Sequence, residues 1–467
     1  MKTSLLRVLS GMLILAACTS CADEPPEVPS TTERDVVFMT LDPGHFHAGL
    51  IHKYDYDQVD STVYVYAPDG DELESHLALV EQFNTRSENP THWALRVYRG
   101  EDYLERMLEE RPGNVMVVAG DNGRKIEYIR RAVQEGIHVL ADKPLVIHPD
   151  SFRTLKETLE TADEQGLLVY DIMTERHVVA TVLQRELSRM PDLFGELVQG
   201  SPDEPAISKE SVHHFYKTVA GKPLVRPAWF FDVNQQGEGI VDVSTHLVDL
   251  ILWQAFPDEP IDYQNPDDGV EVIAARSWDT RLTPDQFTQV TNEAAYPDYL
   301  LPYMESDSTL RVAANGEFTF TVRGVHARVS TLWDYENPEG GDTHYSIMRG
   351  TRANLIIRQD EKQDYRPTLY VEPAKESERQ HVQERLDQAL DRLSSRYQGL
   401  AARPAGEGWE IIIPEVYREG HEEHFTRVAE QYLDYLEKGH LPDWERANLL
   451  TKYFITTRAY ALSRQPQ

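Results

Sequence analysis

Residues 115–144, VMVVAGDNGRKIEYIRRAVQEGIHVLADKP, contain the pattern that decides the fold of the N-terminal part. Val115 to Ala119 form a short, continuously apolar run, as strands buried on both faces of a sheet do. Apolar residues then recur at helical spacing as far as Gly136, and a second apolar run, Val139 to Ala141, follows. This order of strand, helix and strand predicts two parallel strands joined by a crossover helix.

The same alternation extends on both sides of this stretch. Further strand-like runs are Val36 to Leu41, Val63 to Ala67 and Leu167 to Tyr170. Later strands are longer and alternate in polarity, which is typical of antiparallel sheets with one solvated face. We therefore expect an α/β protein with a Rossmann-like, doubly wound parallel sheet in residues 35–175. An α+β domain in residues 176–467, with a largely antiparallel open sheet, is expected to bind substrate and to mediate oligomerisation.

The first 34 residues form a separate segment. Their apolar run, Val8 to Ala17, is too short to span a bilayer and indicates a secretory leader over residues 1–17. The leader ends in LAAC, which resembles the bacterial lipobox, so Cys18 is the expected lipidation site. Residues 18–34 are rich in proline and charge and are expected to form an extended tether. The expected product is an exported bacterial lipoprotein, anchored at the periplasmic face of a membrane or at the cell surface; an uncleaved N-terminal helix is the alternative.

Composition excludes several classes of function. The chain has 46 Lys and Arg against 78 Asp and Glu, a formal net charge of −32. A field of this sign repels phosphate backbones, so we expect no nucleic-acid binding. Both cysteines, Cys18 and Cys21, lie in the N-terminal segment. The folded body therefore has neither a disulfide framework nor a thiolate metal site.

The turn after the first strand is where a dinucleotide's pyrophosphate is expected. It reads DPGHFHAG, residues 42–49, and keeps two of the three small residues that such turns carry, while its two histidines can donate to phosphate. An acid after the second strand normally binds the ribose hydroxyls, and Asp69 stands two positions late for this role. The candidate cofactor-binding residues are Gly44, His45, Phe46, His47, Asp69, Asp121, Asn122, Asp142 and Lys143.

The histidine pair admits a second interpretation. His-x-His after a first strand is also a zinc-binding pair in amidohydrolase barrels. Those barrels need eight strand–helix units and further ligands, which the alternating strands of the second half do not supply. We therefore predict no metal site, and a metal hydrolase stays an alternative.

Two motifs give the chain its resemblance to a known family. ADKP, residues 141–144, follows a predicted strand, and GEGIVDVSTH spans residues 237–246. Together they resemble the Gfo/Idh/MocA superfamily, the relatives of glucose-fructose oxidoreductase and inositol dehydrogenase. Members carry an acid-Lys-Pro triplet at the end of a Rossmann strand and a Gly-Gly-x-x-x-Asp-x-x-x-His signature. VHHFYK at 212–217, RPAW at 226–229 and WERAN at 444–448 resemble one subgroup, described largely only as oxidoreductases.

These motifs also carry suitable chemistry. Asp242 and His246 lie four residues apart on a segment that continues as an apolar helix, so they share one face and could act as a pair. A histidine with a pKa near ~6.5 can remove an alcohol proton at neutral pH. Lys143 at a strand end could stabilise a developing alkoxide. Lys143, Asp242 and His246 are the predicted catalytic residues. The candidate substrate contacts are His213, Lys217, Arg226, Trp229 and Gln236.

The resemblance implies an oxidoreductase that uses NAD or NADP and acts on a hydroxyl group of a sugar or sugar derivative. An exported protein meets little free nicotinamide cofactor, so the cofactor is expected either to be held tightly and recycled on the enzyme or to be reoxidised by an external acceptor. A redox-assisted glycosidase or lyase on the same scaffold and a non-catalytic sugar-binding lipoprotein are the alternatives. The resemblance is also consistent with a homo-oligomer that pairs through the second-domain sheet.

Overall fold

The computed structural model describes residues 36–465, apart from 220–221, 307 and 339. The predicted leader, the lipidation site Cys18 and the tether lie outside the described residues. Within the described part of the chain, no helix is both long enough and apolar enough to cross a membrane.

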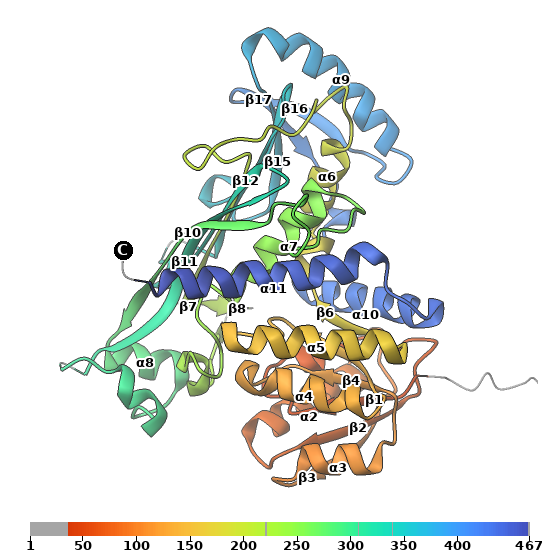
Figure 1. The fold of residues 1–467 in the computed structure, drawn as a ribbon, viewed down its shortest axis with the longest axis vertical. Coiled ribbons are helices and arrows are strands. Elements are labelled where there is room, and N and C mark those ends of the chain that lie inside the picture. The colour runs from red at the N-terminus through yellow and green to blue at the C-terminus, as the bar shows by residue number, and fades with distance from the viewer. Residues whose placement is uncertain (1–35, 220–221, 307, 339, 466–467) are drawn as a thin grey trace, which may run out of the picture.

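Six parallel strands form the first sheet (Figure 1). Their order is β3-β2-β1-β4-β5-β6, so the direction of winding reverses between β1 and β4, as in Rossmann folds. This confirms the predicted doubly wound parallel sheet. The strands are β1 Phe38–Leu41, β2 Thr62–Ala67, β3 Ala94–Arg99, β4 Val115–Val118, β5 His138–Asp142 and β6 Val169–Ile172.

The edge strand β3 has no counterpart among the predicted strands. Continuous apolar runs mark strands that are buried on both faces, and β3, with the sequence ALRVYR, has none of its side chains buried. Its pairing with β2 alone leaves the other side open, where charged residues are common. The physical reason for the omission is therefore the position of the strand at the edge.

Helices from both ends of the chain cover this sheet. On one face α2 packs with the later helix α10, which contributes Phe425 and Tyr432 to the same core as Val117 of β4. The other face is covered by α3, α4, α5 and the last helix, α11, whose Tyr453 is fully buried. The last two helices of the chain therefore belong to the first of two layers, which consists of the first sheet and the helices that cover it. The helices are α1 His47–Leu50, α2 Asp71–Thr85, α3 Tyr103–Glu110, α4 Asn122–Gln134, α5 Pro149–Gln165, α10 His421–Lys438 and α11 Asp443–Ser463.

Nine strands form the second sheet, in the order β10-β11-β12-β7-β13-β14-β15-β17-β16. Only the pairing of β12 with β7 is parallel among those described, so the prediction of a largely antiparallel sheet is confirmed. The strands are β7 Ile207–Tyr216, β10 Glu271–Leu282, β11 Leu310–Val322, β12 Val325–Glu336, β13 Thr343–Arg349, β14 Ala353–Gln359, β15 Thr368–Pro373, β16 Ala401–Ala405 and β17 Gly408–Ile412. A separate ribbon pairs β8 (Thr218–Val219) with β9 (Lys222–Pro223).

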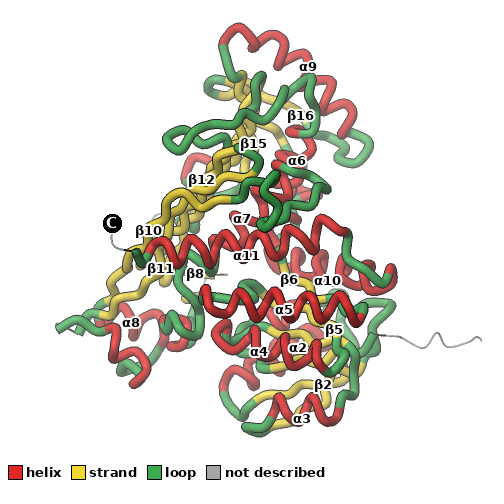
Figure 2. Tube along the Cα trace, viewed as in Figure 1, coloured by secondary structure: helices red, strands yellow, loops and turns green. Residues whose placement is uncertain are grey.

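Four helices accompany the second sheet. Three of them, with α11, gather on one of its faces (Figure 2) and bury their apolar sides in one core with the strands. The fourth lies near one end of the long strands (Figure 1). These helices are α6 Val179–Ser188, α7 Val243–Ala255, α9 Arg379–Leu393 and, at the sheet's end, α8 Pro284–Thr291.

A network of buried charged side chains links the two layers. Arg176, in the short turn after β6, donates through two nitrogens to Asp249 at 2.6 Å each and through a third to Glu445 at 2.6 Å. Lys452 lies 2.8 Å from both Asp249 and Asp171. No side chain of the network is more than 6% exposed. Since its members come from β6, the following turn, α7 and α11, the network fixes these elements relative to one another.

Replacing Arg176 by methionine is expected to lower the free energy of unfolding by about 3–5 kcal/mol, because buried Glu445 loses its ion-pair partner and buried Asp249 keeps only Lys452. Urea denaturation measures the change. The control is Arg396→Met, which removes an ion pair with Glu186 whose arginine is 56% exposed, and about 1 kcal/mol or less is expected there. Equal effects of the two substitutions would contradict this account.

Candidate functional site

An ion pair joins the two layers where the first sheet ends. Lys143 follows β5 and Asp242 directly precedes α7; Lys143 Nζ lies 2.7 Å from Asp242 Oδ1. The two side chains are only 11% and 7% exposed. Gln236 donates from Nε2 to the second carboxylate oxygen of Asp242 at 2.9 Å. Three of the predicted site residues therefore form one connected group.

The groups around Lys143 keep its side chain positively charged. Burial disfavours the ammonium, but the carboxylates of Asp242 and Asp142 outweigh burial and raise its pKa. A second lysine, Lys125, holds the turn that carries Lys143 by donating to the carbonyl oxygens of Asp142 at 2.8 Å and Pro144 at 3.2 Å. Burial lowers the pKa of Lys125 to about 8. Sequence reasoning missed Lys125, which stands inside a helix without a motif.

The hydrogen bonding and the pKa of His246 differ from those predicted from the sequence. Asp242, expected to act with it, binds Lys143 and Gln236 instead, and His246 Nδ1 is buried with no hydrogen-bond partner among the described residues. Burial and the nearby Lys143 lower the pKa of His246 to about 3. The pKa near ~6.5 expected from the sequence is therefore not the pKa of His246 in this environment. The imidazole is neutral at physiological pH.

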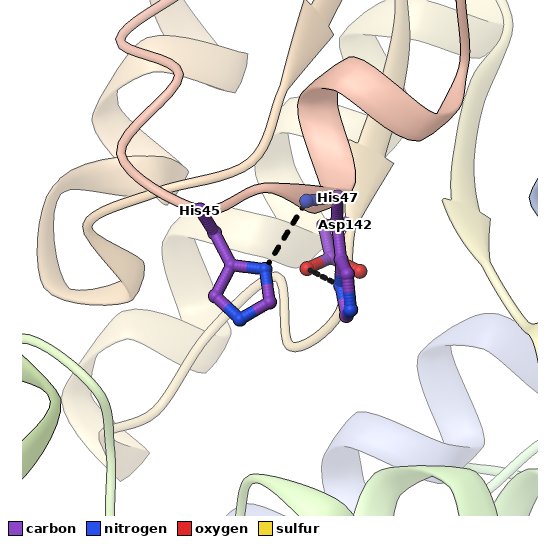
Figure 3. A group of neighbouring side chains, drawn as sticks. All are labelled: His45, His47 and Asp142. Atoms are coloured by element: carbon purple, nitrogen blue, oxygen red, sulfur yellow. Dashed lines mark hydrogen bonds and ion pairs between the residues drawn. The ribbon is translucent and has the colours of Figure 1, made fainter. Parts of the chain in front are cut away.

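Two histidines of the turn after β1 face Asp142 (Figure 3). His47 Nδ1 lies 2.9 Å from Asp142 Oδ2, and the ring centroids of His45 and His47 are 3.9 Å apart at 71°. His45 Nδ1 accepts from the backbone N–H of His47 at 3.4 Å. Burial, with His47 beside it, lowers the pKa of His45 well below its ordinary value. Although burial opposes the charge of Asp142, His47 and Lys125 hold its pKa far below the usual range.

A cavity of about 230 Å³ lies across the carboxyl ends of β1, β2 and β4. This is the switch point of the sheet, where Rossmann folds bind dinucleotides. The turns after β1 and β4 meet closely here: a Cβ atom on Gly120 would lie 2.4 Å from the carbonyl oxygen of Asp42. The wall contains one basic residue, Arg124, and several acidic ones. The acidic residues are Asp42, Asp69, Glu72, Glu101 and Asp121.

The predicted cofactor residues divide between this cavity and internal contacts. Gly44, Asp69 and Asp121 line the cavity, although Asp69 also pairs with Arg99 at 2.7 Å. Asp121 caps α4 by accepting from two backbone N–H groups, while Asn122 donates to the carbonyl oxygen of Gln236 at 2.8 Å. Phe46 is 52% exposed and stacks on the ring of His45.

Of the predicted substrate contacts, His213 and Lys217 have an internal partner. Both bind Asp342, His213 through Nδ1 at 3.1 Å and Lys217 through Nζ at 2.8 Å. His214 reaches the same carboxylate at 3.1 Å. Although burial opposes it, these contacts hold the pKa of Asp342 well below its usual range. The cluster ties the end of β7 to the residue before β13.

Arg226 and Trp229 lie in different surroundings. Arg226 donates to the backbone carbonyl oxygens of Phe215 at 2.8 Å and His214 at 3.0 Å, and burial lowers its pKa to about 10. Its guanidinium also covers the ring of Trp333. Trp229 lines the cavity beside Gly44, so the structure places it with the candidate cofactor residues.

Two further residues near the histidines were missed by the motifs. Glu175 lies in the turn after β6, and its Oε1 is 3.8 Å from Nδ1 of His421, the first residue of α10. The ring centroid of His421 is 6.1 Å from that of His47. The sequence favours a surface position at a helix start for His421, and its side chain is indeed 51% exposed, although the fold also brings it beside Glu175. The place of Glu175 directly after a strand is a signal that could have found it.

Comparison with protein families covers most of the folded chain. Residues 183–464 match the family "Putative oxidoreductase C terminal domain", and residues 62–171 match "Oxidoreductase family, NAD-binding Rossmann fold". The chain belongs to the Gfo/Idh/MocA oxidoreductase family. The second match begins at β2, so the turn with His45 and His47 lies outside it.

Solved structures show the same fold. A structure described as a putative oxidoreductase from Parabacteroides merdae is 51% identical, covers 92% of this chain and 98% of its own, and has a TM-score of 0.89. Levoglucosan dehydrogenase with NADH is 10% identical over 92% and 96% of the two chains, with a TM-score of 0.58. A 3-ketoreductase from Actinomadura kijaniata with NADP and TDP-benzene is 13% identical over 90% and 95%, with a TM-score of 0.52. The last two are similar in fold alone. No match is found among curated proteins.

The state of His246 can be tested directly. With its pKa at about 3, its ring signal in histidine-labelled NMR spectra should stay constant between about pH 8 and pH 5, where an ordinary histidine titrates. His246→Gln assigns the signal. Free histidine in the same buffer is the reference, because its ordinary pKa is near ~6.5. Protonation of His246 with a midpoint near ~6.5 would contradict this assignment.

Proposed function

We propose that this protein is an NAD- or NADP-dependent oxidoreductase that acts on a hydroxyl group of a sugar or sugar derivative. The observation that carries the proposal is the Lys143–Asp242 ion pair at the carboxyl end of β5, on the same edge of the sheet as the switch-point cavity. Membership of an oxidoreductase family supports the reaction class. The description of one fold neighbour, levoglucosan dehydrogenase in complex with NADH and L-sorbose, supports a sugar as the substrate class.

The residues of the cavity fit a nicotinamide dinucleotide. Gly44 lines the cavity and has no side chain to shield its backbone, and Asp69 can accept hydrogen bonds from ribose hydroxyls. Arg124 is the basic group of this wall that can approach a pyrophosphate. When bound, the oxidised cofactor would supply the hydride acceptor.

The chain's own groups would bind and polarise the substrate. Lys143 is cationic and held in place by Asp242, so its ammonium can stabilise negative charge that develops on a substrate oxygen. Neutral His246 can accept a hydrogen bond from the substrate hydroxyl and relay its proton to solvent water as the alkoxide forms. Because burial and Lys143 lower its pKa to about 3, His246 is a weak base that does not retain the proton at neutral pH.

A redox-assisted glycosidase or lyase is the second candidate function. Elimination beside an oxidised carbon needs a further acid or base besides the group that takes the hydroxyl proton. Glu175 and His421, 3.8 Å apart and close to His47, provide such groups at this edge. A reaction that cleaves a glycoside without net reduction of the cofactor would favour this candidate.

Lys143→Met tests the proposed function. The substitution should lower kcat for oxidation of the best sugar in a panel by at least about 10²-fold, because it removes the group that stabilises the alkoxide, and cofactor affinity should change less. Formation of reduced nicotinamide gives the rate, and fluorescence titration gives the affinity. The control is Lys156→Met, which removes a helix-surface pair with Glu160. A wild-type protein that binds sugars and oxidises none would instead be a sugar-binding protein.

We also propose that the protein is exported and anchored by lipid at Cys18, facing the periplasm or the cell exterior. The support is the apolar leader and the LAAC sequence that ends at this cysteine. Mass spectrometry of the N-terminal peptide should show an acylated Cys18 as the first residue, and Cys18→Ser should move the protein from the membrane fraction to the soluble fraction. An unmodified cysteine within an intact leader would contradict the proposal.

A further inference from the structure

We propose that His45, His47 and Asp142 bind one divalent transition-metal ion. The possible ligand atoms of the three side chains lie within 4.8 Å of one another (Figure 3). His45 lies in the turn after β1, His47 is the first residue of α1, and Asp142 is the last residue of β5. The sequence predicted no metal site because its His-x-His pair lacked a third ligand. The fold supplies that ligand from a segment 95 residues further along the chain.

Two imidazoles and one carboxylate match the ligand preferences of zinc, iron or cobalt ions. Such ligands stand about 2.0–2.2 Å from the ion, so they are roughly 3–3.5 Å apart from one another. His47 Nδ1 and Asp142 Oδ2, at 2.9 Å, already have nearly this separation. Closing the remaining gap requires His45 to move by roughly 1–2 Å. The trio would leave coordination positions open for oxygen atoms of water or substrate.

The charges around the trio permit a cation. Asp142 supplies a negative charge that is 8% exposed. Lys143 is the neighbouring cation, and its charge is offset by Asp242 at 2.7 Å. The ammonium of Lys125 points to backbone carbonyl oxygens on the same turn. Thus the hydrogen bonds of Lys125 and the close ion pair of Lys143 go to groups other than the carboxylate of Asp142, which interacts with both ammonium groups at longer range.

The chain contains a second histidine–carboxylate pair, which serves as a comparison for the proposed metal site. His92 and Asp55 form such a pair at 2.7 Å on the surface, with the histidine side chain 76% exposed. That pair belongs to no group of three potential ligands found among the described residues, whereas the His47–Asp142 pair is joined by His45. Asp142 directly precedes Lys143 in the sequence. An ion held by the trio would therefore lie at the end of β5 near Lys143, where it could polarise a substrate oxygen.

The test uses the purified full-length chain after chelator treatment and dialysis. Calorimetric titration with Zn²⁺ should show one site per chain, and Co²⁺ should give visible absorption bands from bound ligands. His47→Ala and Asp142→Asn should each weaken binding by about 10–100-fold or more, since even substitutions of groups that only orient metal ligands have effects of this size. His92→Ala should bind as the wild type does. Circular dichroism confirms folding, and His45→Gln serves as the further variant if either of the first two fails to fold.

Absence of one-to-one Zn²⁺ binding, or equal binding by the wild type and a folded His47→Ala variant, would overturn the proposal. If His92→Ala weakens Zn²⁺ binding as strongly as His47→Ala does, the ion is an adventitious surface ion, and this result would overturn the proposal too. These measurements need neither cofactor nor sugar. Their outcome for the metal site therefore does not depend on whether the proposed oxidoreductase function is correct.

Discussion

The arrangement of the molecule depends on the buried charge network centred on Arg176. Removing charged groups from water is costly, so these side chains are stable in the interior only when all of them are paired. Arg176 and Lys452 meet this condition by binding carboxylates from β6, α7 and α11. The network thereby sets the position of α7 against the first sheet. Asp242, at the start of α7, then lies within reach of Lys143 at the end of β5.

The properties of the candidate site follow from that placement. A lysine alone in a buried turn would lose its charge, whereas Lys143 keeps it because Asp242 and Asp142 are close. The same positive charge, with burial, keeps His246 neutral. The site therefore combines one fixed cation with a neutral histidine. The cavity beside it has a mainly acidic wall, in keeping with a strongly acidic chain.

Sequence patterns were sufficient to predict those features that depend on one continuous segment of the chain. Apolar runs mark the buried strands, and the motifs around Lys143 and Asp242 identify two residues that the fold brings into contact. The edge strand β3 lacks such a run because its side chains face solvent. The pKa of His246, the carboxylate that faces His47, and the approach of His421 depend on contacts between segments far apart in the chain. Spacing within one segment carries no information on such contacts.

The central claim is that the turns after β1, β4 and β5 still hold a nicotinamide dinucleotide despite the unusual first turn. Mass spectrometry of the supernatant from heat-denatured, purified protein tests it most directly. The account predicts NAD or NADP released in an amount equal to that of the protein. Release of no nucleotide, together with no thermal stabilisation by added NAD or NADP, would contradict the claim.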